Sequence, residues 1–362
     1  MDHLIYHLKR FDWILIISTF SLVVIGLVSI YSSSLGKGDF LNFEKQISFF
    51  GIGIFLLLLI SFVDWRSLRE NTNLMLIFYF ASLITLVGLL FFASPIRGVK
   101  SWYKLGFISI DPIEFVKIIL IILLAKYFSL RHIEMYRFRH IIFSGIYVLV
   151  PAILVFLQPD FGSVLIMLVL WVVILVISGI KVRHFLILAL LGLIILILCW
   201  SFLLKDYQRE RVISFFLPYE PLGSGWSQNQ AKIAIGSGGV FGQGIGKGSQ
   251  TQYGFLPEPQ TDFIFSAIAE ETGLIGVFIL FILFSILIWR IIKIALSSQT
   301  NFSRLFASGF AIVLISGIFI NIGMNIGVLP VIGVPLPLIS YGGSNLIAIF
   351  IGLGILESIK TH

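Results

Sequence analysis

The stretch WILIISTFSLVVIGLVSI, residues 13–30, decides the fold. It contains no charged residue, and a helix that crosses the hydrocarbon core of a bilayer needs about 20 mostly apolar residues. The basic residues before it, Lys9 and Arg10, are also typical of a signal peptide. However, the run reaches spanning length and no small-x-small cleavage pattern accompanies it. We therefore expect a retained first transmembrane helix.

The composition of the whole chain agrees with this stretch. Of its 362 residues, 58% are hydrophobic and 12% are charged, and the mean hydropathy is +1.04. A soluble domain is about 45–50% apolar and about 25% charged. We therefore predict an all-α polytopic membrane protein with a single transmembrane domain over residues 1–362. About ten transmembrane helices fit the sequence, beginning near Trp13, Gln46, Leu74, Ile110, Ile141, Gly162, His184, Phe263, Leu305 and Leu338.

The distribution of basic residues predicts the orientation of these helices. The loops on the N-terminal side carry Lys9, Arg10, Arg66, Arg69, Arg131, Arg137, Arg139, Lys181, Arg183, Arg290, Lys293, Arg304 and Lys360. The short loops opposite carry only Lys37, Lys45, Arg97, Lys100 and Lys104. The positive-inside rule then places both termini in the cytoplasm. One long extracytoplasmic loop, about residues 204–262, is expected between the seventh and eighth helices.

The net charge of +7 is spread over short loops, so no nucleic-acid partner is expected.

The motif IDPIEFVK, residues 110–117, places three ionisable groups on one helix face. Asp111, Glu114 and Lys117 are three residues apart, which is the spacing of neighbours along a helix surface. An ionisable group in a spanning helix costs about 2.5–3.5 kcal/mol on insertion scales, so each one needs an explanation. Two interpretations stay open. The cluster is either a buried ion pair that fixes helix packing, or part of a polar, water-filled groove that opens outward.

Two aspartates lie where external loops meet helices. Asp160 belongs to the short turn QPDFG, and Asp262 immediately precedes the apolar run FIFSAIA. Either carboxylate can cap the following helix, because aspartate is among the preferred N-cap residues. Asp262 also lies at the membrane surface, where a base that acts on a lipid-anchored substrate would be needed. Both interpretations of Asp262 remain open from the residues alone.

For the other polar positions we expect structural roles. Glu270 and Glu271 are expected to satisfy neighbouring helices. The glycine-rich stretch GSGGVFGQGIGKGS matches neither G-x-G-x-x-G nor a Walker A loop, so we expect a turned external loop without nucleotide. Asn321 and Asn325 are expected to pack between helices. The Pro- and Gly-rich run at 329–344 predicts a broken, re-entrant segment.

Taken together, these motifs resemble the SEDS family (shape, elongation, division and sporulation). The matching pieces are IRGVKSWYKLGFISIDPIEFVK, QPDFG, YQRERVISFFLP, KIAIGSGGVFGQGIGKGSQTQYGFLPEPQTDFIF and NIGMNIGVLPVIGVPLPLISYGGS. Two positions depart from the family pattern. The usual Q-P-S-E is Asp111-Pro112-Ile113-Glu114 here, and Asn345 follows Ser344 where a second small residue is common.

The resemblance implies a peptidoglycan glycosyltransferase of the bacterial cytoplasmic (inner) membrane that polymerises lipid II into a glycan strand on the outer face. By similarity, Asp262 matches the essential aspartate, Glu114 and Lys117 match the intramembrane pair, and Asp160 matches the aspartate of the QPD turn. The resemblance favours the elongation branch of the family, with the division branch as the close alternative. The implied partners are a class B penicillin-binding protein, the elongation machinery and membrane lipids.

Glycosyl transfer needs a base for the acceptor hydroxyl and positive charge near the departing pyrophosphate. We expect Asp262 to be the base. The candidate cations are Lys117, Arg209, Arg211 and Lys232. A divalent cation, Mg²⁺ or Mn²⁺, is a further candidate with no assigned ligands, and Asp262 could ligate it instead of acting as the base. The competing functions are a lipid II transporter, which would also carry intramembrane charges, and a scaffold without activity.

Overall fold

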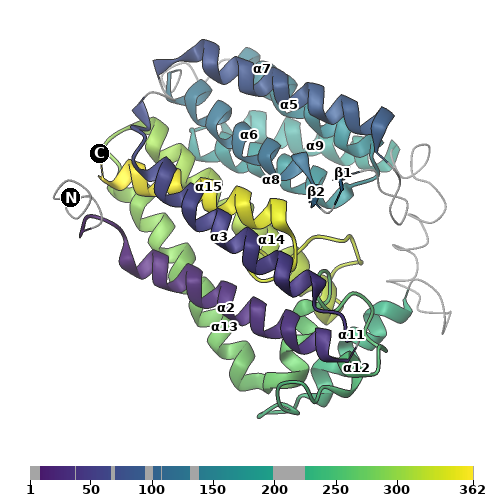
Figure 1. The fold of residues 1–362 in the computed structure, drawn as a ribbon. Helices are drawn as coiled ribbons and strands as arrows, with labels where there is room; N and C mark the ends of the chain where they lie inside the picture. The colour runs from purple at the N-terminus through teal and green to yellow at the C-terminus, as the bar shows by residue number, and fades with distance from the viewer. Residues whose placement is uncertain are drawn as a thin grey trace.

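The computed structural model describes residues 9–36, 38–66, 70–93, 101–106, 108–130, 138–198 and 225–361. Among these residues, ten helices of 17 residues or more form the bundle of Figure 1: α2 (Trp13–Leu35), α3 (Leu41–Ser61), α5 (Thr72–Phe92), α6 (Pro112–Ser129), α7 (Phe138–Leu157), α8 (Phe161–Ile177), α9 (Val182–Leu198), α13 (Ile264–Ser297), α14 (Asn301–Ile326) and α15 (Gly343–Thr361). The prediction of a polytopic helical membrane protein is confirmed.

Within the described ranges, seven helices have the length and hydropathy of a membrane span: α2, α3, α5, α7, α13, α14 and α15. Two others, α8 and α9, are apolar but shorter. The remaining helix, α6, carries Glu114, Lys117 and Lys126 within its 18 residues. One departure from an all-helical chain is a hairpin of β1 (Tyr103–Leu105) and β2 (Ile108–Ile110), which pairs Tyr103 with Ile110.

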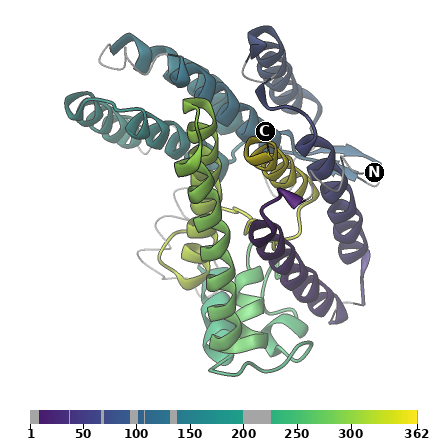
Figure 2. The ribbon, with the colours of Figure 1, turned by 90° about the vertical axis from the view of Figure 1, so that its left-hand side faces the viewer.

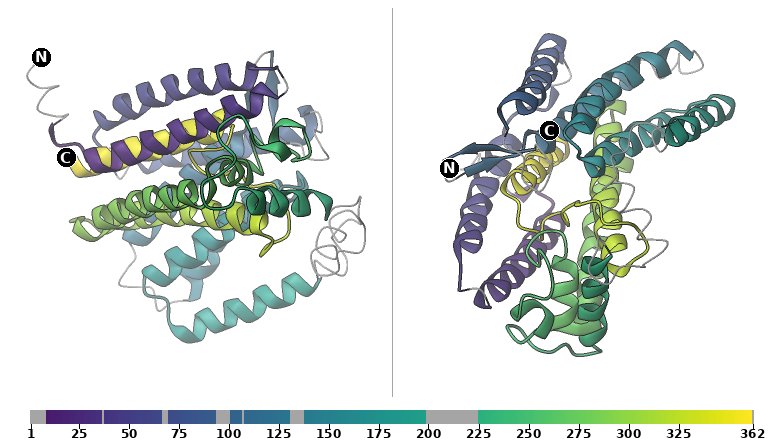
Figure 3. Two further views of the ribbon diagram at one scale, coloured as in Figure 1. Left: turned by 90° about the horizontal axis from the view of Figure 1, so that it is seen from below. Right: turned by 90° about the vertical axis from the view of Figure 1, so that its right-hand side faces the viewer.

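Both chain ends lie at one end of the bundle, while α11 (Trp226–Ser237) and α12 (Ser249–Gln252) lie at the other (Figures 1 and 3). Figure 2 views the molecule from the end that carries the termini. The Asp12 carboxylate joins the two ends there: Arg290 Nε donates to Asp12 Oδ1 at 2.9 Å, and Lys360 Nζ lies 3.2 Å from Oδ2. The Asp12 backbone N–H donates to Glu357 Oε2 at 3.0 Å. The predicted even number of spans agrees with this arrangement.

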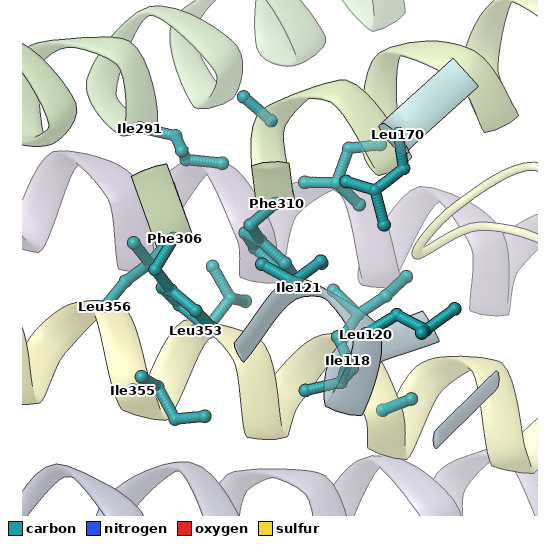
Figure 4. Packing of buried hydrophobic residues seen from close by; sticks show 14 of the residues in the cluster. Ile118, Leu120, Ile121, Leu170, Ile291, Phe306, Phe310, Leu353, Ile355 and Leu356 are labelled. Carbon is teal, nitrogen blue, oxygen red and sulfur yellow. The ribbon is translucent and has the colours of Figure 1, made fainter. Parts of the chain in front are cut away.

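The core of the bundle is built around α14. Phe302, Phe306 and Phe310 stack along this helix, with ring centroids 6.4 Å apart at each step. Figure 4 shows Phe306 and Phe310 beside residues of α15 and α6, including Leu353 and Ile121. Apolar burial drives helix association weakly in lipid, so this close packing is the main source of cohesion between the helices.

The sequence predicted a continuous helix from near Phe263, but the helix found there, α13, is broken. Gly273 interrupts α13 with φ 67° and ψ −164°, a backbone conformation available to glycine without strain. The amides of Leu274 and Ile275, which begin the second part, donate to the carbonyls of Gly239 and Val240 in the glycine-rich loop at 3.0 and 3.3 Å. The break therefore docks the loop onto the start of the long lipid-facing part of the helix.

The glutamates before this break were expected to satisfy neighbouring helices, and they bind both helices and the glycine-rich loop. Glu270 accepts hydrogen bonds from the amides of Gln250 and Thr251, at 2.6 and 3.1 Å, at the start of α12. Glu271 accepts from the Ser32 hydroxyl and, at 3.3 Å, from the Gly246 amide. Two buried carboxylates thus fix the glycine-rich loop.

The run at 327–342 is non-helical, as its proline and glycine content predicts. The start expected for the last helix, near Leu338, is wrong: α15 begins at Gly343, and Leu338 has φ 68°. Ser340 fixes the segment, since its hydroxyl donates to the Thr261 carbonyl at 2.6 Å and accepts from the Leu336 amide at 2.8 Å. The Tyr341 amide donates to the Gln260 carbonyl at 2.8 Å. The re-entrant segment is therefore tied to the residues just before Asp262.

Candidate functional site

The predicted ion pair forms in the first two turns of α6. Lys117 Nζ lies 2.7 Å from Glu114 Oε1, and the two residues are only 4% and 8% exposed. The second carboxylate oxygen of Glu114 accepts a hydrogen bond from Asn345 Nδ2 at 2.9 Å. Each oxygen of this buried carboxylate thus has a partner, which reduces the penalty of burying it. The residue that departs from the family pattern, Asn345, supplies one of those partners.

A cavity of about 30 Å³ lies beside the pair, large enough for a water molecule. Glu114, Lys117 and Asn345 form its polar wall. The remaining lining is apolar and includes Phe310 of α14 together with Val334 and Pro335 of the re-entrant segment. Among the described residues, the pair therefore faces a small, mostly apolar chamber; whether a polar, water-filled groove opens outward from it stays a prediction.

Asp111 and Asp160 cap the two helices beside this chamber. Asp111 Oδ1 accepts from the Ile113 amide at 2.9 Å, and Asp160 Oδ1 accepts from the Ser163 amide at 3.0 Å. The capping interpretation of Asp160 is confirmed. Burial raises the pKa of the Asp160 carboxyl, while the hydrogen bonds from Ser163 and the charge of Lys117 act to lower it.

Asp262 is held at the entrance to α13. Phe263 occupies the N-cap position of α13, so Asp262 lies one residue before it, at the N-terminal end of the helix, where the sequence placed it. Its backbone carbonyl accepts from Asn321 Nδ2 at 3.1 Å and from Asn325 Nδ2 at 2.9 Å. A Cβ placed on Gly333 would lie 3.7 Å from Asp262 Oδ2. The carboxylate is thus partly exposed and lies beside the re-entrant segment.

The re-entrant segment connects the predicted site residues. Gly333 borders Asp262, and the next residue, Val334, lines the chamber of Glu114 and Lys117. Val334 also packs against Gly162, in the turn that carries Asp160. Asn321 holds this segment in place, because its Nδ2 donates to the Val334 carbonyl at 2.8 Å. Groups that are far apart in the sequence therefore surround one segment.

The predicted cations are placed differently. Lys232 is an exposed residue of α11, and its side chain lies over Gly327, the C-cap of α14. A cation at that position is stabilised by the negative end of the α14 dipole. Arg209 and Arg211 lie outside the described residues. The cation that the described part of the chain places beside Glu114 is Lys117.

Comparison with known proteins identifies this architecture. The profile of the FtsW, RodA and SpoVE family, described as "cell cycle protein", matches residues 11–362. The chain belongs to this family. It is 36% identical over 343 residues to the peptidoglycan glycosyltransferase MrdB of Escherichia coli strain K12, which covers 94% of this chain and 91% of MrdB. It is 35% identical over 361 residues to stage V sporulation protein E of Bacillus subtilis strain 168, which covers 97% of each chain.

Solved structures share the fold of this chain. The chain matches a solved peptidoglycan synthase complex, described for its coordination of polymerization and crosslinking, with TM-score 0.82 and 33% identity over 97% of both chains. It matches the rod shape determining protein RodA of Thermus thermophilus with TM-score 0.72 and 30% identity, over 97% of this chain and 96% of that one. The motifs that carried the resemblance in the sequence thus identify the correct family.

Three asparagines have roles in this member of the family that their sequence pattern did not predict. Asn321 and Asn325 were expected to serve packing alone, yet both bind the backbone of Asp262. Asn325 Oδ1 also accepts from the Ser266 hydroxyl at 2.6 Å. Their i, i+4 spacing on a buried helix was the available signal, since buried amides must find partners. For Asn345, the only sequence signal of its contact with Glu114 was its departure from the family pattern.

The described residues offer little for a metal ion. Within those ranges, no group of three or more His, Cys, Asp or Glu side chains is arranged to bind one. Asp111, Glu114 and Asp160 share an electrostatic environment, but Lys117 lies among them and Glu114 is already paired.

Proposed function

We propose that this chain is a peptidoglycan glycosyltransferase that polymerises lipid II into glycan strands. The observation that carries the proposal is the arrangement around the re-entrant segment: Asp262 borders Gly333, and the Glu114–Lys117 pair lines a chamber at Val334. This arrangement occurs in a chain 36% identical to a protein named peptidoglycan glycosyltransferase. It supplies a carboxylate and a buried cation beside one short stretch of backbone.

In the proposed reaction, Asp262 accepts the proton of the 4-hydroxyl group of the acceptor sugar. The oxygen then bonds to C1 of the donor sugar, and the bond from C1 to the pyrophosphate oxygen breaks. A general base must lie within hydrogen-bond reach of the proton that it removes. The partly exposed position of Asp262 at the mouth of the bundle allows a lipid-anchored sugar to approach it.

Undecaprenyl pyrophosphate leaves with added negative charge, which nearby cations stabilise. Lys117 is the best-placed described candidate, because its ammonium is buried and already fixed by Glu114. Lys232 is the second candidate, at the end of the bundle that carries the external segment. Arg209 and Arg211 complete the proposed set from the sequence. The chemistry of Mg²⁺ or Mn²⁺ would serve the same step, and no step here requires it.

We assign the chain to the elongation branch, with a class B penicillin-binding protein and the elongation machinery as partners. The match to a synthase complex that coordinates polymerization and crosslinking supports such a partnership. The similar identities to MrdB and to stage V sporulation protein E, 36% and 35%, leave the division-type role as the alternative. The site would face the periplasm or exterior from the cytoplasmic membrane. Rescue of rod shape in cells that lack the elongation polymerase tests the assignment, and rescue of division alone would overturn it.

A lipid II transporter is the second candidate function, because the buried Glu114–Lys117 pair is the kind of group that transporters carry within the membrane. The two functions separate in detergent, where there is no second compartment and transport has no meaning. Purified chain, with its penicillin-binding partner and lipid II, is expected to produce glycan polymer on a gel. Absence of polymer, together with lipid II translocation in vesicles, would favour the transporter.

A further inference from the structure

Lys126 is a buried lysine that the proposed reaction does not use. It lies nine residues beyond Lys117, which is about 13 Å along α6, in the last turn of the helix. The residue is only 4% exposed, and its Nζ makes no hydrogen bond within the described parts of the chain. Lys117, by contrast, is paired with Glu114. A buried ammonium without a partner is strongly unfavourable, so Lys126 calls for a ligand beyond those that the described residues provide.

Lys126 lines a pocket of about 500 Å³ between the ends of three helices. This volume is in the range of small-molecule sites. The pocket lies at the end of the bundle where both chain termini lie, which the distribution of basic residues predicts to be cytoplasmic. Its other lining residues are Glu70, Thr72, Ser129, Leu130, Thr300, Asn301 and Phe302.

The electrostatics of the pocket favour an anion. Thr72 is the first residue of α5 and Asn301 is the first residue of α14, so two helices present their N-terminal ends to it. Helix N-termini carry partial positive charge and free amide donors. Asn71, at the N-cap of α5, makes no side-chain capping bond. Glu70 is the one opposing charge in the lining; it is exposed, where solvent and salt screen it.

We propose that this pocket binds a phosphate group, with Lys126 as its cationic partner and the polar groups at the starts of α5 and α14 as donors. Basic pockets between transmembrane helices on the cytoplasmic side are typical sites for lipid headgroups, whose phosphate is the abundant anion at a membrane surface. The phosphate belongs either to an anionic phospholipid of that leaflet or to a soluble phosphate ester. This site is separate from the proposed glycosyl transfer.

The test compares the full-length chain with two variants that lose the same charge. Lys126→Met removes the buried ammonium, and Lys293→Met removes an exposed one from α13 near the same end of the bundle. Each protein is reconstituted in nanodiscs of phosphatidylcholine, with and without phosphatidylglycerol. Native mass spectrometry then counts retained phosphatidylglycerol, and equilibrium dialysis in detergent measures binding of inorganic phosphate.

Loss of one charge-assisted hydrogen bond is expected to weaken binding about tenfold or more in Lys126→Met, while Lys293→Met binds like the wild type. Selective retention of phosphatidylglycerol identifies the lipid as the source, and saturable inorganic phosphate binding identifies a soluble ester. Thr72→Val alters an exposed pocket residue that leaves the core intact, and about threefold weaker binding is expected there. Equal binding of both probes by the wild type, Lys126→Met and Thr72→Val would overturn the proposal.

Discussion

Replacing Lys117 with methionine tests whether the buried pair serves packing alone or the reaction as well. The substitution removes an ammonium 2.7 Å from Glu114 Oε1 and leaves a carboxylate that is 8% exposed. Removing one partner of a buried ion pair costs about 3–5 kcal/mol. The hydrogen bond from Asn345 to the other oxygen remains, so we expect the lower end of that range, about 3 kcal/mol. Thermal unfolding in detergent, with Lys293→Met as the exposed control, measures the loss.

The double variant Glu114→Gln with Lys117→Met separates the two roles. It leaves no uncompensated charge, and glutamine keeps an amide oxygen for Asn345, so stability is expected to return to within about 1 kcal/mol of the wild type. Glycan polymerisation is expected to be lost in the single variant Lys117→Met and in the double variant alike. A single Lys117→Met variant as stable as the wild type would refute the reasoning about burial. A stable double variant that polymerises lipid II at the wild-type rate would reduce the pair to a packing device.

Three further predictions concern neighbouring features. Asn325→Ala removes one of the two amides that hold the Asp262 carbonyl, and we expect the polymerisation rate to fall about tenfold or more while partner binding persists, as a pull-down with the penicillin-binding protein would check. Glu270→Ala leaves the start of α12 without its acceptor, so faster proteolysis of the glycine-rich loop is expected in limited digestion. Burial acts to raise the pKa of Asp12, but hydrogen bonds from Arg290 and Leu15 outweigh it and leave the pKa below its usual value. The stability that Asp12 contributes is therefore complete at neutral pH and lost as pH falls below about 4, and a pH series of melting temperatures should show this loss in the wild type and not in Asp12→Asn.

The helices could be predicted from the sequence because lipid leaves few alternatives. A spanning segment must satisfy its own backbone and present apolar side chains, and both requirements are readable residue by residue. The break at Gly273 was not predictable in this way, because a single glycine within an apolar run also occurs in continuous helices. Its conformation depends on the carbonyls of Gly239 and Val240, which only the folded chain brings there. The start predicted for α15, near Leu338, was wrong for the same reason: contacts of the folded chain, such as that of Ser340 with Thr261, hold the preceding residues out of the helix.

The site was predictable where its contacts are local. Glu114 and Lys117 lie one turn apart on a helix, so their spacing alone predicted the ion pair. The same spacing argument could not connect Asn345 with Glu114, 231 positions away. Nor could it show that Asn325 reaches back to Asp262, because both contacts depend on the packing of α14 and α15 around α6 and α13. The resemblance to the family identified Asp262 as a candidate. Its neighbours Asn321 and Asn325 could be identified only from the fold.

Lipid II polymerisation by Asp262→Asn tests most directly whether Asp262 acts as the general base. Asparagine matches aspartate in shape but cannot accept the proton, and the backbone carbonyl at this position still accepts from Asn321 and Asn325, so the fold should be retained. The purified variant, in complex with its penicillin-binding partner, is predicted to elute and melt like the wild type and to produce no glycan polymer. Polymer formed at the wild-type rate by the folded variant would show that Asp262 is not the base.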